Sequence, residues 1–178
     1  MMCDAFGIID YCSANCPGSY HDQTVLESSH IYEEYQIKKR LPFEGAMVLG
    51  DSAYKRSWDW LITPFLEGDC VGDARRTHFN ECICGCRSII ECVYGQLKKK
   101  FPVLKGDGIR FTSMVKCTKL IQCLAAIYNF IKRQNNPNDI FELNEEDKNE
   151  NRQSEEIYEG PADSISTNDV FLTKYFPL

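Results

Sequence analysis

The sequence predicts an α/β domain over residues 1–133, followed by an acidic tail over residues 134–178. Two observations predict the domain: short extended apolar runs come first, and two long helical patterns follow them. A third observation sets the tail apart, because it holds 3 Lys and Arg against 11 Asp and Glu, whereas residues 1–133 hold 17 against 15. A segment this acidic and this poor in apolar residues buries too little surface to offset the entropy lost on ordering. We therefore expect it to be mostly disordered.

The start of the chain and its cysteines indicate a reducing compartment. Residues 1–4 (MMCD) lack the basic start and the apolar run of a signal peptide. We expect no apolar stretch of the roughly 18–20 residues that cross a bilayer, and therefore no membrane partner. Without secretion, the ten cysteines are better explained as reduced thiols than as a disulfide framework. The expected location is nuclear, with the cytoplasm as the alternative.

Strands and one helix are expected in the first part of the domain. Residues 1–6 and 8–13 have the pattern of an antiparallel hairpin, with Gly7 at its turn. A helix is expected from about His21 to Ile37.

The middle of the domain combines a buried strand with shorter pieces. Residues 46–49 (AMVL) form the expected strand, which runs directly into Gly50 and Asp51. Residues 58–61 predict a helical turn, residues 61–65 an extended piece, and residues 66–77 a loop.

Two long helices complete the domain. They are expected from about Phe79 to Lys100 and from about Thr112 to Arg133. Apolar residues in the second recur at spacings of three and four, so we expect their face to contact the core. They are Cys117, Leu120, Ile121, Leu124, Ile127, Tyr128 and Ile131.

Asp51 lies just beyond the carboxyl end of the expected apolar strand, and two roles fit it. An Asp before Ser commonly starts a turn or caps a helix. In α/β sheets, however, functional groups gather beyond the carboxyl ends of strands. An acid there, paired with an acid on a packed helix, holds a hard cation such as Mg²⁺. Spacing alone leaves these two roles open.

One face of the first long helix combines an acid with cations and a glycine. At 100° per residue, five side chains that fall within about 60° of Glu91 are those of Arg87, Ser88, Tyr94, Gly95 and Lys98. The residues expected to face the core are Cys86, Ile89, Ile90, Val93 and Leu97. The simpler interpretation is a solvated face with an Arg87–Glu91 pair inside the helix. The alternative is a phosphate-facing surface with a metal-binding carboxylate at its centre.

Four stretches of the chain carry a family resemblance. In chain order they read "CDAFGIIDYCSANCPGSYHD", "LGDSAYKRSWDWLITPF", "FNECICGCRSIIECVYGQLKKKFPVL" and "IQCLAAIYNFI". In order and spacing they resemble the nuclease domain of the PIF/Harbinger transposases and the Harbinger transposase-derived nucleases. The resemblance covers residues 1–133 and leaves the acidic tail unexplained.

The resemblance implies an RNase H-like fold with an Asp-Asp-Glu site, in which divalent ions (Mg²⁺ or Mn²⁺) act on DNA phosphodiesters. By motif, Asp51 matches the second acid and Glu91 the third, so both are expected to be catalytic metal ligands that converge on a shared cation. Arg87, Lys98 and Lys99 are then expected to contact the DNA backbone. A separate Myb-like DNA-binding protein is an implied partner.

The first acid of the family has no match in this chain. Its Asp-Gly-x-His-type motif is absent, and Asp4 matches the family's next strand instead. The position after Glu91, often basic in the family, is Cys92. Because the first acid lies on the central strand of such a sheet, we expect an RNase H-like fold that lacks its central first strand, in an incomplete domain. The alternative function is a catalytically inactive remnant that binds DNA or protein.

A histidine–aspartate pair and a basic run each have two interpretations. His21 and Asp22 match a His-Asp element of the family. The simpler interpretation is a helix N-terminus with an acid in its first turn. The alternative is a supporting role near the metal. The run of lysines at 98–100 suits DNA or nuclear import, although such runs more often end a solvated helix.

A cysteine-rich stretch suggests zinc. Cys82, Cys84 and Cys86 alternate, with His78 and Cys92 nearby. Structural zinc sites usually pair cysteines from two separate segments, and alternating thiols on a helix diverge. Small buried thiols are therefore the preferred interpretation.

Overall fold

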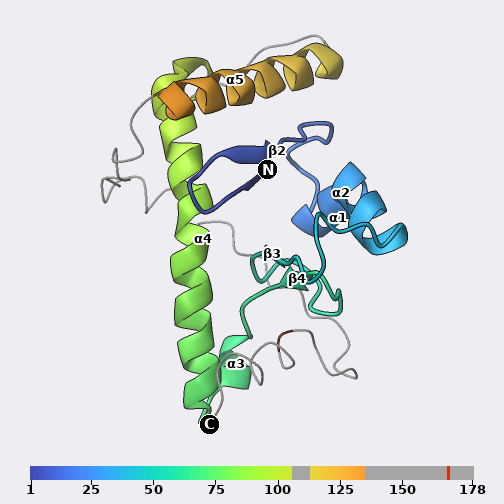
Figure 1. Ribbon diagram of the computed structural model, residues 1–178, viewed down its shortest axis with the longest axis vertical. Coiled ribbons are helices and arrows are strands. Elements are labelled where there is room, and N and C mark those ends of the chain that lie inside the picture. Colours follow the sequence, from blue (N-terminus) through green and yellow to red (C-terminus); the bar gives the residue numbers. More distant parts are fainter. Residues whose placement is uncertain (106–112, 135–167, 169–178) are drawn as a thin grey trace. The chain divides into compact units, whose positions relative to one another are not determined.

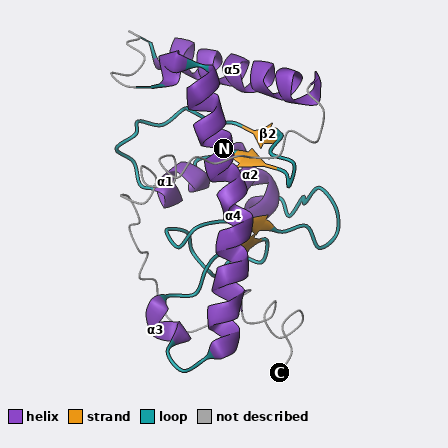
Figure 2. Cartoon of the chain, turned by 90° about the vertical axis from the view of Figure 1, so that its left-hand side faces the viewer, coloured by secondary structure: helices purple, strands orange, loops and turns teal. Residues whose placement is uncertain are grey.

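The computed structural model describes residues 1–105, 113–134 and 168. They belong to two compact units, and each unit is described by itself. Unit 1 contains residues 1–18 and 88–153, and unit 2 contains residues 19–87 and 154–178. Helices and short two-stranded sheets make up the described part, as the α/β prediction requires (Figures 1 and 2).

Unit 1 begins with the predicted hairpin. Strand β1 (Met2–Cys3) pairs antiparallel with β2 (Ile9–Tyr11). The Asp4 side chain holds the turn, because its Oδ1 accepts hydrogen bonds from the backbone N–H groups of Phe6 (2.9 Å) and Ile8 (2.8 Å). Gly7 adopts φ of 70°, a conformation that glycine reaches without steric cost.

The core of unit 1 joins the hairpin to two helices. These are the second half of α4 (Ala74–Lys100) and α5 (Met114–Gln134), and a 3₁₀ turn (Pro102–Leu104) follows α4. The buried side chains are Ile9, Val93, Leu97, Ala125 and Tyr128. Four of these five come from helical faces. The predicted core contact of the last helix is confirmed at Leu124 and Tyr128, which are buried, and is wrong at Ile127, which is 47% exposed.

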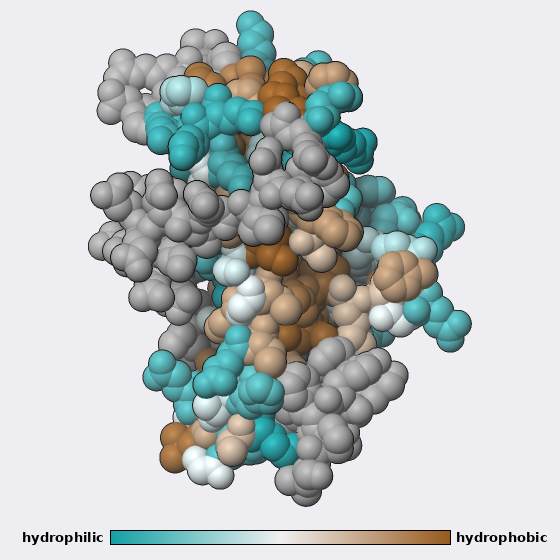
Figure 3. Space-filling view, turned by 60° about the vertical axis from the view of Figure 1, so that its left-hand side comes forward, coloured by the Kyte–Doolittle hydropathy of each residue, from teal (hydrophilic) through white to brown (hydrophobic). Residues whose placement is uncertain are grey.

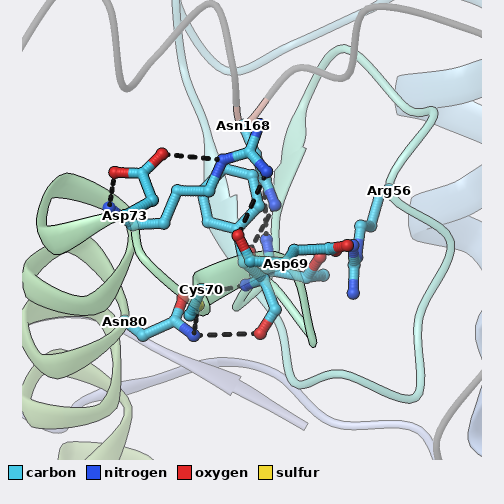
Figure 4. Close-up of polar contacts among 9 residues, drawn as sticks. Arg56, Asp69, Cys70, Asp73, Asn80 and Asn168 are labelled. Atoms are coloured by element: carbon cyan, nitrogen blue, oxygen red, sulfur yellow. Dashed lines mark hydrogen bonds and ion pairs between the residues drawn. The ribbon is translucent and has the colours of Figure 1, made fainter. Parts of the chain in front are cut away.

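Three asparagines each bind both backbone polar groups of one distant residue. Asn129 Oδ1 accepts from the Ile9 N–H and its Nδ2 donates to the Ile9 carbonyl, both at 2.8 Å. In unit 2, Asn80 binds Phe65 in the same way, at 2.8 and 2.9 Å. Asn168 does so for Thr63, at 3.3 and 2.5 Å, and both of these residues are fully buried (Figure 4). The amide side chains thus satisfy backbone groups that such short strands leave without a ladder partner.

Unit 2 begins with a helical segment that is broken once. The single helix expected from His21 to Ile37 is instead α1 (Asp22–Glu27), α2 (His30–Tyr32) and a π-helix (Glu33–Ile37). The break has a local cause: Ser29 is extended, and its Oγ accepts a hydrogen bond from the Tyr32 N–H at 3.2 Å. A serine in this N-cap position starts a new helix.

A parallel strand pair forms the centre of unit 2. Strand β3 (Val48–Leu49) pairs with β4 (Leu61–Ile62), with Val48 opposite Leu61. Both strands are shorter than predicted. The helical turn expected at residues 58–61 is a single turn, closed by a hydrogen bond from the Leu61 N–H to the Trp58 carbonyl at 3.3 Å, and Leu61 continues into β4.

An aromatic cluster surrounds the turn at residues 58–61. The rings of Trp58 and Trp60 stack at 5.4 Å. Tyr32 packs against Trp58, and Tyr35 meets Trp60 edge-on. Trp60 Nε1 also donates to Gln36 Oε1 at 2.9 Å. The cluster, whose two tryptophans are buried, therefore ties the π-helix to the start of β4.

Helix α4 begins earlier than the sequence predicts. The expected loop at residues 66–77 contains α3 (Glu67–Cys70), and α4 starts at Ala74 instead of about Phe79. Asp73 Oδ1 accepts hydrogen bonds from the backbone N–H groups of Arg75 (3.0 Å) and Arg76 (3.2 Å), which caps the helix. Inside unit 2, Phe79 of α4 meets Phe65 edge-on at 5.1 Å.

Helix α5 is more apolar than the sequence analysis expected. In the described part of the chain it is the one helix whose length and composition would suffice to cross a membrane. Phe130, 65% exposed, is the most open of its large apolar side chains. Apolar side chains are visible at the level of α5 in Figure 3. Because its other face supplies Ala125 and Tyr128 to the core of unit 1, length and composition alone are weak evidence for a membrane span.

Alkaline pH is expected to destabilise unit 1 through Tyr128. Burial, and after it the nearby Cys3 and Cys92, raises the pKa of this phenol from 10.0 to about 12. Because the folded-state pKa lies above the unfolded value, this contribution is fully present below about pH 10 and is lost as the pH rises toward about 12. Urea unfolding of the full chain at about pH 9 and about pH 11 should therefore show a drop in stability that is smaller in Tyr128→Phe. An equal drop in that variant would contradict the assignment.

Candidate functional site

Asp51 follows β3 and makes two different contacts with its two carboxylate oxygens. Oδ1 accepts a hydrogen bond from the Ala53 N–H at 3.0 Å, which forms a turn. Oδ2 lies 3.8 Å from Nη2 of Arg87. The parallel pair fixes this position, because the Gly50 N–H donates to the Ile62 carbonyl at 2.8 Å. The turn expected of an Asp before Ser is therefore present, and the second oxygen still faces a cation.

Gly50 has a packing role that the sequence analysis did not anticipate. A Cβ on this residue would meet the Tyr54 ring at 2.9 Å and the Leu61 side chain at 3.2 Å. The missing side chain therefore lets the segment pack closely.

Arg87 lies on α4 in unit 2, and its side chain is 18% exposed. Helical spacing suggests a pair with Glu91 inside the helix, whereas the ion pair found in the structure joins Arg87 to Asp51. Such a pair of half-buried groups contributes little to stability by itself. Its significance is electrostatic, because a positive group already lies beside the oxygen that is expected to bind a cation.

Glu91 lies on α4 one helical turn after Arg87 by sequence, and its side chain is half-buried. It belongs to unit 1 and Asp51 to unit 2, so each acid is described within its own unit. Their convergence on one cation stays a prediction. Lys98 and Lys99 lie in the last turn of α4, where cations also complement the helix dipole.

The apolar side of α4 only partly matches the prediction. Val93 and Leu97 are buried as expected, and Cys92 is buried beside them. Cys86 is exposed, so its expected core position is wrong. Cys84 is exposed as well and Cys82 is half-buried, so the interpretation of this stretch as buried thiols holds for Cys92 alone. Cys82, Cys84 and Cys86 lie on the part of α4 that belongs to unit 2, whereas Val93 and Leu97 pack in unit 1.

His21 and Asp22 occupy the start of α1. His21 is the extended residue before the helix, and Asp22 is the acid in its first turn. The helix-terminus interpretation is therefore confirmed, because an acid there complements the helix dipole. Both side chains are exposed. Their supporting role near a metal stays a prediction.

The donor atoms at these positions fit a hard cation in type. Mg²⁺ prefers oxygen ligands, keeps several waters, and is commonly held by only one or two carboxylates. Asp51 offers Oδ2, an oxygen that already lies beside the positive charge of Arg87. Within the described ranges, no cluster of three or more His, Cys, Asp and Glu side chains suits a metal ion. A closely spaced pair of ions repel each other strongly, so they need more shared negative charge than the Asp51 carboxylate alone supplies.

Comparison with known proteins identifies the family. Residues 1–129 match the family model described as DDE superfamily endonuclease. The chain belongs to this family. Comparisons with curated proteins and with solved structures found no match. Asp51, Arg87, Glu91, Lys98 and Lys99 all lie inside the matched region.

Membership of the DDE superfamily endonucleases confirms the coarser part of the sequence prediction. The family is one of nucleases and transposase-derived proteins that generally use divalent metal ions and act on DNA. The sequence analysis found Asp51, Glu91 and Arg87 by motif and helical position. The Arg87–Asp51 pair is not predicted by any local pattern, and neither are the roles of Asn80 and Asn168, because a lone asparagine gives no sequence signal.

Proposed function

We propose that this chain is a metal-dependent DNA nuclease domain of PIF/Harbinger type, with an RNase H-like fold. Asp51 and Glu91 are its surviving metal ligands, and its location is nuclear. The observation that carries the proposal is the match of residues 1–129 to the DDE superfamily endonucleases, a region that contains both acids. No residue of the chain is assigned as the first acid of the family.

The bound cation would polarise the scissile phosphate and activate the attacking water or hydroxyl group. The protein's own contribution is to hold oxygens and positive charges in place. The turn at Ala53 fixes the Asp51 carboxylate through Oδ1, and Oδ2 faces Arg87. Arg87 balances the charge of Asp51, and with a cation held at that carboxylate it would be placed to bind a DNA phosphate. Lys98 and Lys99 bind further backbone phosphates.

Removal of the metal tests the function directly. The full chain should nick supercoiled DNA with Mg²⁺ or Mn²⁺, and should lose that activity completely in excess chelator. Adding either metal back should restore cleavage, because the chain's own ligands are oxygens. Cleavage that persists in the chelator would contradict the proposal.

A second candidate function is a catalytically inactive module that binds DNA or protein. It is favoured by the finding that the described residues include no cluster of three or more metal-ligating side chains. This candidate predicts DNA binding without cleavage under every metal condition. The nicking assay and a binding assay on the same preparation therefore distinguish the two candidates.

Arg87→Gln is expected to weaken DNA binding by removing one phosphate contact. Each neutralised phosphate contributes about 0.9 to the slope of log K against log salt for duplex DNA, so the slope should become shallower by about one. Binding is measured on a duplex with Ca²⁺ in place of Mg²⁺, over a range of salt concentrations. Arg56→Gln is the matched control, because Arg56 also pairs with an aspartate, Asp69 at 2.7 Å, and has 24% of its side chain exposed. An equal change of slope in both variants would argue against a phosphate contact by Arg87.

The PIF/Harbinger assignment also implies a partner. Transposases of this type work with a separate Myb-like DNA-binding protein, which supplies the choice of target. The four sequence stretches that resemble the type support this proposal. Co-purification from the nucleus of the source cell would test the location and the partner together.

A further inference from the structure

A histidine and a cysteine face each other on α4, among residues that the nuclease proposal does not use. His78 Nε2 lies 3.8 Å from Cys82 Sγ. The two residues are four positions apart, which brings their side chains together on one face of a helix. Both belong to the part of α4 that lies in unit 2. In the absence of a metal, this contact is at most a weak hydrogen bond.

The distance between these two atoms suits a shared metal ion. Zinc binds histidine nitrogen at about 2.0–2.1 Å and cysteine sulfur at about 2.3 Å, so tetrahedral ligands of these types lie roughly 3.5 Å apart. The observed separation of 3.8 Å is within a few tenths of an ångström of that value. A small side-chain rotation would therefore bring both atoms onto one ion.

A third residue orients the imidazole. Glu81 Oε2 lies 3.7 Å from Nδ1 of His78, the ring nitrogen that does not face the thiol. In metal sites, the second nitrogen of a ligating histidine commonly faces a carboxylate, which fixes the tautomer and makes the ligand more basic. One ring nitrogen of His78 thus faces the Cys82 thiol and the other faces the Glu81 carboxylate, as such a site requires.

The chemistry of the pair selects the class of metal. Thiolate and imidazole suit zinc and similar transition metals, whereas Mg²⁺ and Mn²⁺ favour carboxylate and water oxygens. The pair is therefore distinct in type from the site assigned to Asp51 and Glu91. Helical ligands four residues apart are a recurrent way of holding zinc with two side chains.

We propose that His78 and Cys82 bind one zinc-class cation, with Glu81 as the residue that positions His78. The Cys82 thiol releases its proton to water when the sulfur binds the metal. In the described part of the chain, no third His, Cys, Asp or Glu completes the cluster. The remaining coordination positions are filled by water or by ligands from outside this group of residues.

Residue-resolved alkylation of the full chain tests the proposal. The reduced protein is treated briefly with an alkylating agent, with and without Zn²⁺, and each cysteine is quantified by mass spectrometry. Zn²⁺ should slow alkylation of Cys82 by about tenfold or more, because a metal-bound thiolate is a poor nucleophile. Cys84 is the internal control: it is exposed, and it points about 200° away around the helix. Mg²⁺ should protect neither thiol.

Two variants decide whether the protection belongs to this pair. His78→Asn should abolish the protection of Cys82, and Glu81→Gln should lower the apparent Zn²⁺ affinity by about tenfold. Both positions are exposed, so the fold should tolerate these changes. The proposal is overturned if Cys82 is not protected in the wild type, if Cys84 is protected equally, or if His78→Asn keeps the protection. Because the readout is alkylation, failure here would leave the nuclease proposal unaffected, and loss of cleavage would leave this one unaffected.

Discussion

Asp51→Asn should lower the metal-dependent cleavage rate about a thousandfold, a loss of about 4 kcal/mol of transition-state stabilisation. The amide keeps the size of the side chain and the oxygen that accepts from Ala53, but it removes the negative charge beside Arg87. A neutral amide binds a divalent cation far more weakly than a carboxylate. Single-turnover cleavage of a DNA duplex with Mg²⁺ measures the effect without interference from product release.

Asp59→Asn is the matched control for this prediction. Asp59 is an exposed aspartate in the same unit, and it too has a cationic partner, Lys39 Nζ at 3.2 Å. Losing that pair should change the cleavage rate by less than about twofold, since exposed ion pairs contribute little. A thousandfold loss in both variants would indicate a general effect of lost charge.

Glu91→Gln adds a test of whether the two acids act on one ion. Each single change should remove most of the activity, and the double variant with Asp51→Asn should be hardly worse than either single change. Residues that serve one catalytic unit are strongly non-additive in this way. Fully additive losses would mean that Asp51 and Glu91 act separately, and the shared-cation proposal would fail.

Periodicity was sufficient to predict the larger elements. The spacing of apolar residues predicted α5 to within two residues at its start and one at its end. The hairpin followed from two extended runs around Gly7. Both predictions succeeded because the signals are local: a repeated helical face, and a glycine in a tight turn.

Contacts between distant residues set the limits of prediction. Asn80, Asn129 and Asn168 each bind the backbone of a residue at least fifteen positions away, and no local pattern identifies such partners. The early start of α4 depends on a cap at Asp73, in a stretch whose polar composition predicts a loop. The exposed position of Cys86 also depends on tertiary packing, because helical geometry alone does not say which side of α4 is covered in unit 2.

The candidate site was predicted in parts. Motifs identified Asp51 and Glu91, and helical geometry placed Arg87 on the same face as Glu91. The partner of Arg87 was not predicted, because a local pair four residues away was the only one that the sequence offered. The structure instead brings Asp51 to Arg87 from a segment 36 residues earlier in the chain.

Trp60→Ala should lower the free energy of unfolding by about 3–5 kcal/mol, the range for removing a large buried aromatic ring. Trp60 is 1% exposed, stacks on Trp58, and meets Tyr35 edge-on. Its loss would also leave Gln36 Oε1 without the indole donor. Since natural domains have only about 5–15 kcal/mol of stability in total, the variant should lose a large part of its native population.

A graded series separates the ring from its hydrogen bond. Trp60→Phe keeps an aromatic ring but lacks the donor to Gln36, so it should cost about 1–2 kcal/mol. Phe43→Ala, at a 69% exposed position in the same unit, should change stability by less than about 0.5 kcal/mol. Urea unfolding followed by far-ultraviolet circular dichroism measures all three variants. If Trp60→Ala were no worse than Phe43→Ala, the aromatic cluster would not be what holds the π-helix against the start of β4, and the position of Asp51 beyond β3 would need another support.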